Sequence, residues 1–240
     1  MELQRAWMLH SRPYKEQSVI AEFLVENHGR VAMVVRGVRK ARSSHAALLQ
    51  PFNSLLISWK GRSELKTLVN LEPLTNTRLL GNALYCGFYI NELLLRAMIQ
   101  GQELEGVTEL YEDVVARLAT AHTPLEPLLR SFELALLDLA GYLPELDVDA
   151  ATGLPLSPDA VYRFQQETGL LPIVPPVSED LRASCFPAEL LLALSSRDFS
   201  RSEFYAGFKR FTRMALKPLL GHYPLQSRLL FQTRRKTPES

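Results

Sequence analysis

The sequence predicts an α+β fold in which a small β domain precedes a mostly helical one. Residues 1–75 alternate strand-like apolar runs with short breaker segments, whereas apolar residues after position 78 recur at three- and four-residue steps. A chain of 240 residues that is 47% hydrophobic can bury a substantial core, which excludes a disordered protein. We therefore expect one domain at residues 1–78 and another at 79–240.

The β part contains about five short strands. Its runs of Val, Ile, Leu and aromatic residues cover 6–14, 19–38, 48–61 and 64–74. His28-Gly29 and the segment 59–63 separate strand-like runs and predict hairpins. Five strands within about 75 residues indicate a small barrel or a sandwich.

The helical part begins with three long periodic segments. We expect helices over 79–100, 103–121 and 124–140. Thr123 and Glu126 have the spacing of a capping box, with Pro124 at the first helical position.

The remaining segment of the second domain is less regular. Residues 142–186 contain many prolines and predict irregular structure, with room for a hairpin near 162–164. A short helix is expected at 187–194. A second capping box, Ser200 and Glu203, predicts a helix to Leu220 whose last turn is distorted by Pro218.

Charge is distributed unevenly along the chain. Residues 1–80 have 12 Lys and Arg against 6 Asp and Glu, so their net charge is +6. The net charge is −12 over residues 81–200 and +7 over residues 201–240. Two basic ends around an acidic middle suggest that the ends bind a polyanion, although chance clustering on a solvated surface would give the same pattern.

Motifs for catalysis, cofactors or membrane insertion are missing from the sequence. No histidine pair has the spacing of a helical zinc site, and no nucleophile elbow or phosphate-binding glycine loop occurs. No apolar run reaches about 18 residues, and no secretory signal is evident. Cys86 and Cys185 are far apart in sequence. These features predict a cytoplasmic, non-enzymatic protein without a cofactor or metal.

Basic side chains in the β domain are the strongest functional candidates. They fall mostly between the expected strands, where they could converge and displace counterions from phosphates. Aromatic residues nearby could stack on bases, although Phe52 and Trp59 fit core positions better. The candidate DNA-binding residues are Arg12, Lys15, Arg30, Arg36, Arg39, Lys40, Arg42, Lys60, Arg62 and Lys66.

A second basic set lies near the C-terminus. Lys209, Arg213 and Lys217 are spaced four residues apart and would form one ridge on a helix. Arg130 is a further isolated cation. Considered by its spacing alone, it would pair with Glu126 one helical turn earlier.

A series of short motifs spans nearly the whole chain. They are LHSRPY at 9–14, GRV at 29–31, RGVR at 36–39, LQPF at 49–52, LKTL at 65–68, YINEL at 89–93, FELALL at 132–137, RFTRMALKP at 210–218 and SR at 227–228. In this order, the motifs resemble those of one known family, the RecO family of bacterial recombination mediators.

The resemblance implies an N-terminal OB-fold, followed by a helical domain. It also implies a mediator that binds single- and double-stranded DNA, anneals complementary strands and contacts the single-stranded DNA-binding protein SSB. Together with RecR, such a mediator promotes loading of RecA. In the family, the basic surface of the OB-fold binds DNA, and the protein is expected in the cytoplasm with the nucleoid.

The resemblance also suggests a binding site for the acidic and apolar C-terminal tail of SSB. Arg130, directly before FELALL, matches a family arginine at that site in the helical domain. Arg213, Lys217 and Arg228 are further candidates. A cation beside an apolar pocket is what a terminal carboxylate requires.

One departure from the family concerns zinc. Many members have four cysteines in the region equivalent to 142–186, where this chain has only Cys185. Asp147 and Asp149 are poor substitutes for thiolates. We therefore expect no zinc here and a segment held by its prolines and local packing.

Two other functions remain open from the sequence. A protein–protein adaptor would use the acidic middle for docking and would not bind DNA. A nuclease or other hydrolase would need a carboxylate set for which the sequence gives no clear candidate. Binding of DNA across salt concentrations and turnover of labelled DNA would separate these functions.

Overall fold

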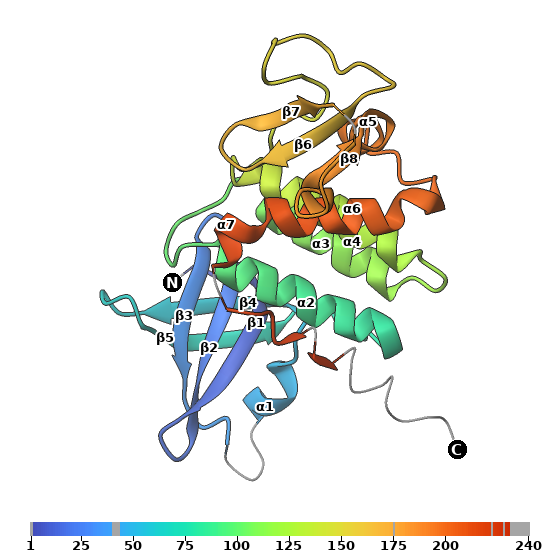
Figure 1. Ribbon diagram of the computed structural model, residues 1–240. Coiled ribbons are helices and arrows are strands. Elements are labelled where there is room, and N and C mark those ends of the chain that lie inside the picture. Colours follow the sequence, from blue (N-terminus) through green and yellow to red (C-terminus); the bar gives the residue numbers. More distant parts are fainter. Residues whose placement is uncertain (1, 40–43, 175, 222, 228, 231–240) are drawn as a thin grey trace. The chain divides into compact units, whose positions relative to one another are not determined.

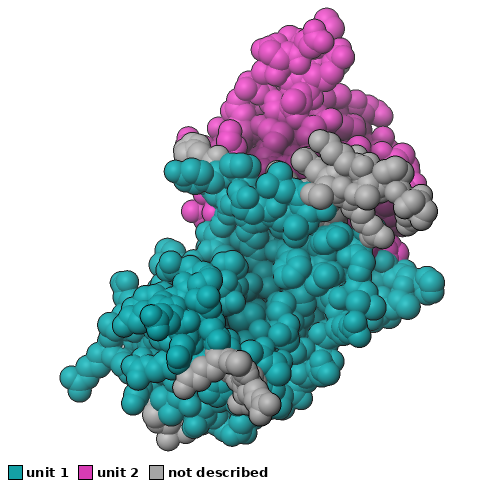
Figure 2. Space-filling view, turned by 90° about the horizontal axis from the view of Figure 1, so that it is seen from below, with its two compact units in different colours: residues 1–123, 220–240 teal, residues 124–219 magenta. Residues whose placement is uncertain are grey.

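The computed structural model describes residues 2–39, 44–174, 176–221, 223–227 and 229–230 (Figure 1). The chain forms two compact units. The first comprises residues 1–123 and 220–240, and the second comprises residues 124–219 (Figure 2). The change from strands to helices falls between residues 73 and 81, inside the first unit.

Five strands of the first unit close into a barrel. They are β1 (Gln4–Tyr14), β2 (Ser18–Val25), β3 (Gly29–Val35), β4 (Ser54–Lys60) and β5 (Lys66–Pro73). Their order around the barrel is β1-β2-β3-β5-β4, with α1 (Ser44–Leu48) between β3 and β4. Only the β3–β5 pairing is parallel, between Met33 and Lys66 and between Val34 and Thr67. This arrangement confirms the expected α+β class with an OB-like barrel.

The barrel closes because alternate side chains of its strands are apolar and point inward. Phe23, Met33 and Ile57 are fully buried at its centre. Trp59 packs against this core from a partly buried position, and Phe52 is buried as expected. The other buried members of the core are Ala6, Met8, Val19, Ala21, Val25, Val31, Val35, Leu49, Leu55 and Leu71.

Two helices, α2 (Gly81–Ala97) and α3 (Val107–Ala119), belong to the same unit as the barrel. Asn91 on α2 donates a hydrogen bond to the carbonyl of Leu9 on β1 at 2.9 Å and accepts one from the hydroxyl of Tyr111 at 2.8 Å. Burial raises the pKa of Tyr111 despite that hydrogen bond. The ring of Tyr111 also meets Trp7 edge-on. A satisfied polar link therefore joins the barrel to α2 and α3.

Arg30 on β3 ties the barrel to the end of α2. Its guanidinium donates to the carbonyls of Leu95 at 2.6 Å and Met98 at 3.2 Å, and it pairs with Glu22 on β2 at 3.0 Å. A cation at a helix C-terminus stabilises the free carbonyls and the helix dipole. The neighbouring Gly29 has φ +66°, and a Cβ there would lie 2.0 Å from the carbonyl oxygen of Gln102. This approach therefore requires glycine.

The second unit combines helices with a small sheet. Its helices are α4 (Leu125–Leu139), α5 (Ala188–Ser195) and α6 (Tyr205–Ala215), and α7 (Lys217–Leu220) follows α6. The sheet has the order β7 (Gly169–Ile173), β6 (Val161–Gln165) and β8 (Cys185–Pro187). Its core includes Phe132, Phe186, Phe208 and Phe211. Short 3₁₀ turns cover Arg182–Ser184 and Ser202–Phe204.

This sheet corrects the prediction of irregular structure over residues 142–186. Strands β6 and β7 form an antiparallel hairpin in which Val161 pairs with Ile173 and Gln165 pairs with Gly169. The hairpin expected in this region is therefore confirmed. Strand β8 then pairs with the other side of β6. The prediction missed β8 because its three residues are too few to show a period.

Neither predicted capping box forms. The hydroxyl of Thr123 donates to the carbonyls of Arg117 and Thr120, so it terminates α3 rather than capping α4. Ser200 is likewise not a cap, because a 3₁₀ turn precedes α6. The predicted helix 200–220 ends at Ala215, and Pro218 lies in the separate α7. The side chains had alternative partners that sequence spacing does not reveal.

A polar clasp on α2 holds the chain after residue 220. Glu92 accepts hydrogen bonds from the amides of Gln226 and Ser227 at 2.9 and 2.8 Å and from the Ser227 hydroxyl at 2.7 Å. Arg96 pairs with Glu92 and donates to the carbonyls of Leu220, Tyr223 and Pro224. Partial burial raises the pKa of Glu92, but the hydrogen bonds from Ser227 and Gln226 and the charge of Arg96 lower it by more.

We predict that Arg30→Ala lowers the free energy of unfolding by at least about 2 kcal/mol. The change removes charge-assisted hydrogen bonds to two helix-terminal carbonyls and leaves Glu22 unpaired. Chemical denaturation measures the loss. The matched change Arg12→Ala, at an exposed arginine of the same barrel, should alter stability by no more than about 0.5 kcal/mol. Equal denaturation midpoints for the Arg30→Ala and Arg12→Ala variants would contradict this role of Arg30.

The clasp also predicts a pH dependence. Because the pKa of Glu92 is lowered in the folded state, its stabilisation is present above the unfolded-state pKa and is lost as pH falls through the folded-state pKa. Glu92→Gln should therefore be less stable than wild type at pH 7, and the difference should shrink on acidification. Melting curves from pH 7 to pH 3 measure it, with the exposed Glu105→Gln as control. A constant difference at all pH values would refute the prediction.

Candidate nucleic-acid interface

The ten candidate DNA-binding residues separate by their exposure and contacts. Lys40 and Arg42 lie outside the described residues. Arg30 is partly buried and bound internally, and Lys66 has intermediate exposure. The exposed candidates are Arg12, Lys15, Arg36, Arg39, Lys60 and Arg62.

One group of cations lies where β1 turns into β2 and where β3 ends; we call Arg12, Lys15, Arg36 and Arg39 the hairpin-end group. The amide of Arg39 donates to the carbonyl of Gln17 at 3.3 Å, and its guanidinium donates to the carbonyl of Lys15 at 3.3 Å. The register pairs Val35 with Val19, which places Arg36 beside the start of β2. Two segments distant in sequence therefore present their charges at one end of the barrel.

A second group lies around the β4–β5 loop; we call Lys60, Arg62 and Lys66 the loop group. The ammonium of Lys66 donates to the carbonyl of Gly61 at 3.4 Å, across the loop. Beside this loop, the exposed His28 meets the partly buried Trp59 edge-on, with 5.1 Å between ring centroids. The sequence did not suggest this ring pair, because it joins a hairpin turn to another strand.

The two groups lie on different loops of the barrel. The parallel pairing of β3 with β5 places Lys66 opposite Met33, three residues before Arg36, so β5 begins beside the end of β3. Figure 1 shows the β1–β2 and β4–β5 loops projecting in different directions. The barrel therefore presents its exposed candidate cations on two sets of loops, and their convergence on one side remains a prediction from the sequence.

Arg30 differs from the other candidates because its contacts support a structural role inside the first unit. Its guanidinium is occupied by Glu22 and by two carbonyls at the end of α2. These contacts use the Nε and Nη1 donors of the guanidinium, which a phosphate would otherwise share. The sequence could not reveal them, because the partners on α2 lie 65 and 68 residues away.

The hairpin-end and loop groups have no acidic partners. Among the described residues, none of their seven side chains forms an ion pair, whereas Arg5, Arg30, Arg96 and Arg117 of the same unit all do. Lys15 lies over the ring of Tyr14, with 5.4 Å between the ammonium and the ring centroid. These cations are available to a polyanion without first breaking an ion pair.

The candidates for tail binding occupy a different unit. Arg130 on α4 is only 3% exposed, and it pairs with the fully buried Glu133 at 2.8 Å. It also donates a long hydrogen bond of 3.5 Å to the hydroxyl of Thr212 on α6. The partner suggested by spacing, Glu126, instead pairs with Lys209. Arg130 therefore links α4 and α6 from a buried position.

The predicted ridge of cations is interrupted. Lys209 is bound to Glu126 at 2.7 Å, and Lys217 belongs to α7 rather than α6. Arg213 and Lys217 are exposed, and Arg213 directly follows Thr212, the hydroxyl partner of Arg130. Arg228 lies outside the described residues.

The donor set for a zinc ion is not assembled. Within the described parts of the chain, no three His, Cys, Asp or Glu side chains come together as metal ligands. Cys185 is buried in β8, and its carbonyl accepts a hydrogen bond from Arg210. The residues of this chain therefore do not fit the family's zinc site.

Across the described residues, no helix is both long and apolar enough to span a bilayer.

Comparisons with known proteins agree with the barrel-then-helix architecture. Residues 1–77 match the family model "Recombination protein O N terminal", and residues 79–229 match "Recombination protein O C terminal". A protein named DNA repair protein RecO from Actinobacillus pleuropneumoniae serotype 7 is 41% identical over 231 residues, which cover 95% of this chain and 94% of the relative.

Relatives from other bacteria are equally similar. The DNA repair protein RecO of Proteus mirabilis is 41% identical over 95% of this chain and 92% of its own length. The DNA repair protein RecO of Vibrio cholerae is 41% identical over 96% of this chain and 93% of its own length. Both family models and these full-length relatives lead to one conclusion: this chain is a member of the RecO family.

Proposed function

We propose that the protein is a non-enzymatic recombination mediator in DNA repair. It binds single- and double-stranded DNA, anneals complementary strands, contacts SSB and, with RecR, promotes loading of RecA. The proposal rests on family membership and on one observation: seven basic side chains on the barrel lack acidic partners among the described residues. We place this activity in the cytoplasm, at the nucleoid.

In this proposal, the barrel holds nucleic acid through its phosphates. Lysine and arginine release counterions from the strand, and this attraction does not depend on base sequence. The hairpin-end and loop groups each neutralise the phosphates of one segment. Reducing the repulsion between two segments would help complementary strands to pair. The partly buried Trp59 beside Lys60 and Arg62 offers a ring edge to a base of a single strand.

The second unit supplies contact with the SSB tail in this proposal. Arg213 and Lys217 are the exposed cations for the tail's acidic side chains and terminal carboxylate. Arg130 holds α4 against α6 rather than reaching the tail itself, because Glu133 occupies its guanidinium and burial hides it. Its role is therefore one of positioning.

The DNA-binding proposal predicts the effect of Arg36→Glu combined with Arg39→Glu. Binding of a fluorescein-labelled oligothymidylate should weaken at least about tenfold at low salt, because two phosphate contacts become repulsive. The slope of log K against log salt concentration should also decrease by roughly 1.4, about 0.7 per lost contact. Fluorescence anisotropy between about 50 and 300 mM salt measures both quantities.

The matched control is Arg117→Glu, at an exposed arginine on α3 of the same unit. It changes the net charge but not the barrel groups, so the salt slope should be unchanged. If wild type shows no salt-dependent binding, the proposal is wrong and a protein–protein adaptor becomes the better account. Equal slopes for all three proteins would place the contacts elsewhere.

The tail-binding proposal predicts that Arg213→Glu with Lys217→Glu weakens binding of a labelled SSB C-terminal peptide at least about tenfold, since two attractive charges become repulsive. Oligothymidylate binding should remain within about twofold of wild type. Arg182→Glu, at an exposed arginine of the same unit, is the control. Retention of peptide binding by the double variant would refute this site.

Arg130→Ala is a less informative test of tail binding. It would leave Glu133 buried without its cation, which typically costs about 3–5 kcal/mol of stability. Loss of peptide binding in that variant would mix unfolding with loss of contact. The exposed pair Arg213 and Lys217 avoids this difficulty.

A further inference from the structure

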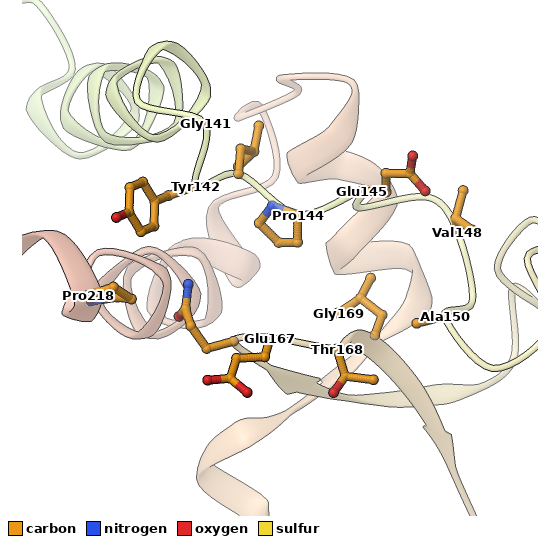
Figure 3. Close-up of a pocket in the computed structure, with 13 residues that line it drawn as sticks. Gly141, Tyr142, Pro144, Glu145, Val148, Ala150, Glu167, Thr168, Gly169 and Pro218 are labelled. Atoms are coloured by element: carbon orange, nitrogen blue, oxygen red, sulfur yellow. The ribbon is translucent and has the colours of Figure 1, made fainter.

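A groove in the second unit is lined by none of the proposed DNA-binding or tail-binding residues. It lies between the segments 141–150 and 166–170, with Pro218 of α7 at one side, and has a volume of about 550 Å³. Figure 3 shows Tyr142, Pro144 and Glu145 along one side of this space and Glu167 and Thr168 along the opposite side. This volume is within the range of sites that bind small ligands or peptide side chains.

Backbone hydrogen bonds hold both walls of the groove. The amides of Tyr142 and Leu143 donate to the carbonyl of Leu137 at the end of α4, at 2.8 and 3.1 Å. The amide of Ala150 donates to the carbonyl of Leu170 on β7 at 2.8 Å, which ties the loop to the hairpin. The groove is therefore formed by fixed backbone and needs little ordering when a ligand binds.

The charge of the groove is negative. Its lining includes Glu145 and Glu167, both exposed, and no lysine, arginine or histidine. The surrounding segment 141–170 has five acidic residues and one basic residue, Arg163. A phosphate or an acidic peptide would be repelled here, so this groove differs in preference from both proposed basic sites.

The floor and sides of the groove combine apolar and polar surface. Tyr142 is 45% exposed, and its neighbours in the lining include Leu143, Pro144, Val148 and Pro218. An exposed tyrosine presents an apolar ring that can pack on an aliphatic side chain or a guanidinium at small entropic cost. Apolar surface flanked by carboxylates is complementary to a peptide segment that combines an apolar side chain with a positive charge.

We propose that this groove binds an extended peptide segment of a partner protein, in which an apolar side chain lies next to lysine or arginine. The apolar side chain packs between Tyr142 and the prolines, and the cations pair with Glu145 and Glu167. This assigns a use to the acidic middle of the chain that neither nucleic-acid binding nor tail binding employs. Recognition of this kind depends on a buried apolar anchor with a charged rim.

Three labelled ten-residue peptides test the proposal by fluorescence anisotropy with the full chain. The first alternates leucine with arginine, the second replaces arginine by glutamate, and the third replaces leucine by serine. Only the first should bind well, since it alone has both features. Glu145→Lys with Glu167→Lys should weaken its binding at least about tenfold, and Tyr142→Ala should also weaken it.

Asp159→Lys is the matched control, because Asp159 is an exposed acid of the same segment that does not line the groove. The affinity of the Asp159→Lys variant for the leucine–arginine peptide should stay within about twofold of that of the wild type. The proposal is overturned if the leucine–arginine peptide does not bind, if the glutamate peptide binds equally well, or if the Glu145→Lys/Glu167→Lys variant binds like wild type. Melting curves verify that each variant is folded, and oligothymidylate binding keeps this test separate from that of the proposed function.

Discussion

Some basic side chains of the first unit form ion pairs with acids, and others do not. Arg5, Arg30 and Arg96 pair with acids and hold helices or the returning chain in place. The cations of the hairpin-end and loop groups have no such pairs among the described residues. Because like charges repel when left uncompensated, these groups favour a polyanion partner. The barrel's closure and register decide which cations belong to which group.

The presence of two cationic groups on separate loops gives the proposed activity a physical basis. In the proposal, each group contacts the phosphates of one nucleic-acid segment. Each site needs only phosphate contacts, so the sequence of the bound strand is left to base pairing. The second unit contributes different chemistry, with exposed cations on α6 and α7 and an acidic groove between the β6–β7 hairpin and the loop after α4. In the proposal, nucleic-acid and protein contacts lie on different residues and should be separable by mutation.

Much of the fold could be predicted from periodicity and breakers. The strands, the first three long helices and the change from β to α structure depend on local pattern, which the sequence contains directly. The capping boxes failed because Thr123 found carbonyl partners at the end of α3. Within the three-stranded sheet, a hairpin was expected, but β8 was missed because it has only three residues and ends at a proline, Pro187.

The candidate site was predictable in its chemistry more than in its geometry. Exposed loop cations such as Lys15 and Arg39 follow from charge clustering and turn signals. The internal role of Arg30 and the pairing of Arg130 with Glu133 depend on neighbours that only the folded chain brings together or selects. Where an arginine has several possible acids at helical spacing, tertiary packing decides between them, as it does when Lys209 takes Glu126.

Lysine acetylation with and without a bound oligothymidylate tests the central claim most directly, because it reports which ammonium groups meet the strand. The account predicts that bound DNA slows modification of Lys15 and Lys60, read by mass spectrometry. The modification of Lys209, which is already paired with Glu126 in the second unit, should not change. Unchanged modification of Lys15 and Lys60 by saturating DNA would contradict the assignment of the barrel as the nucleic-acid surface.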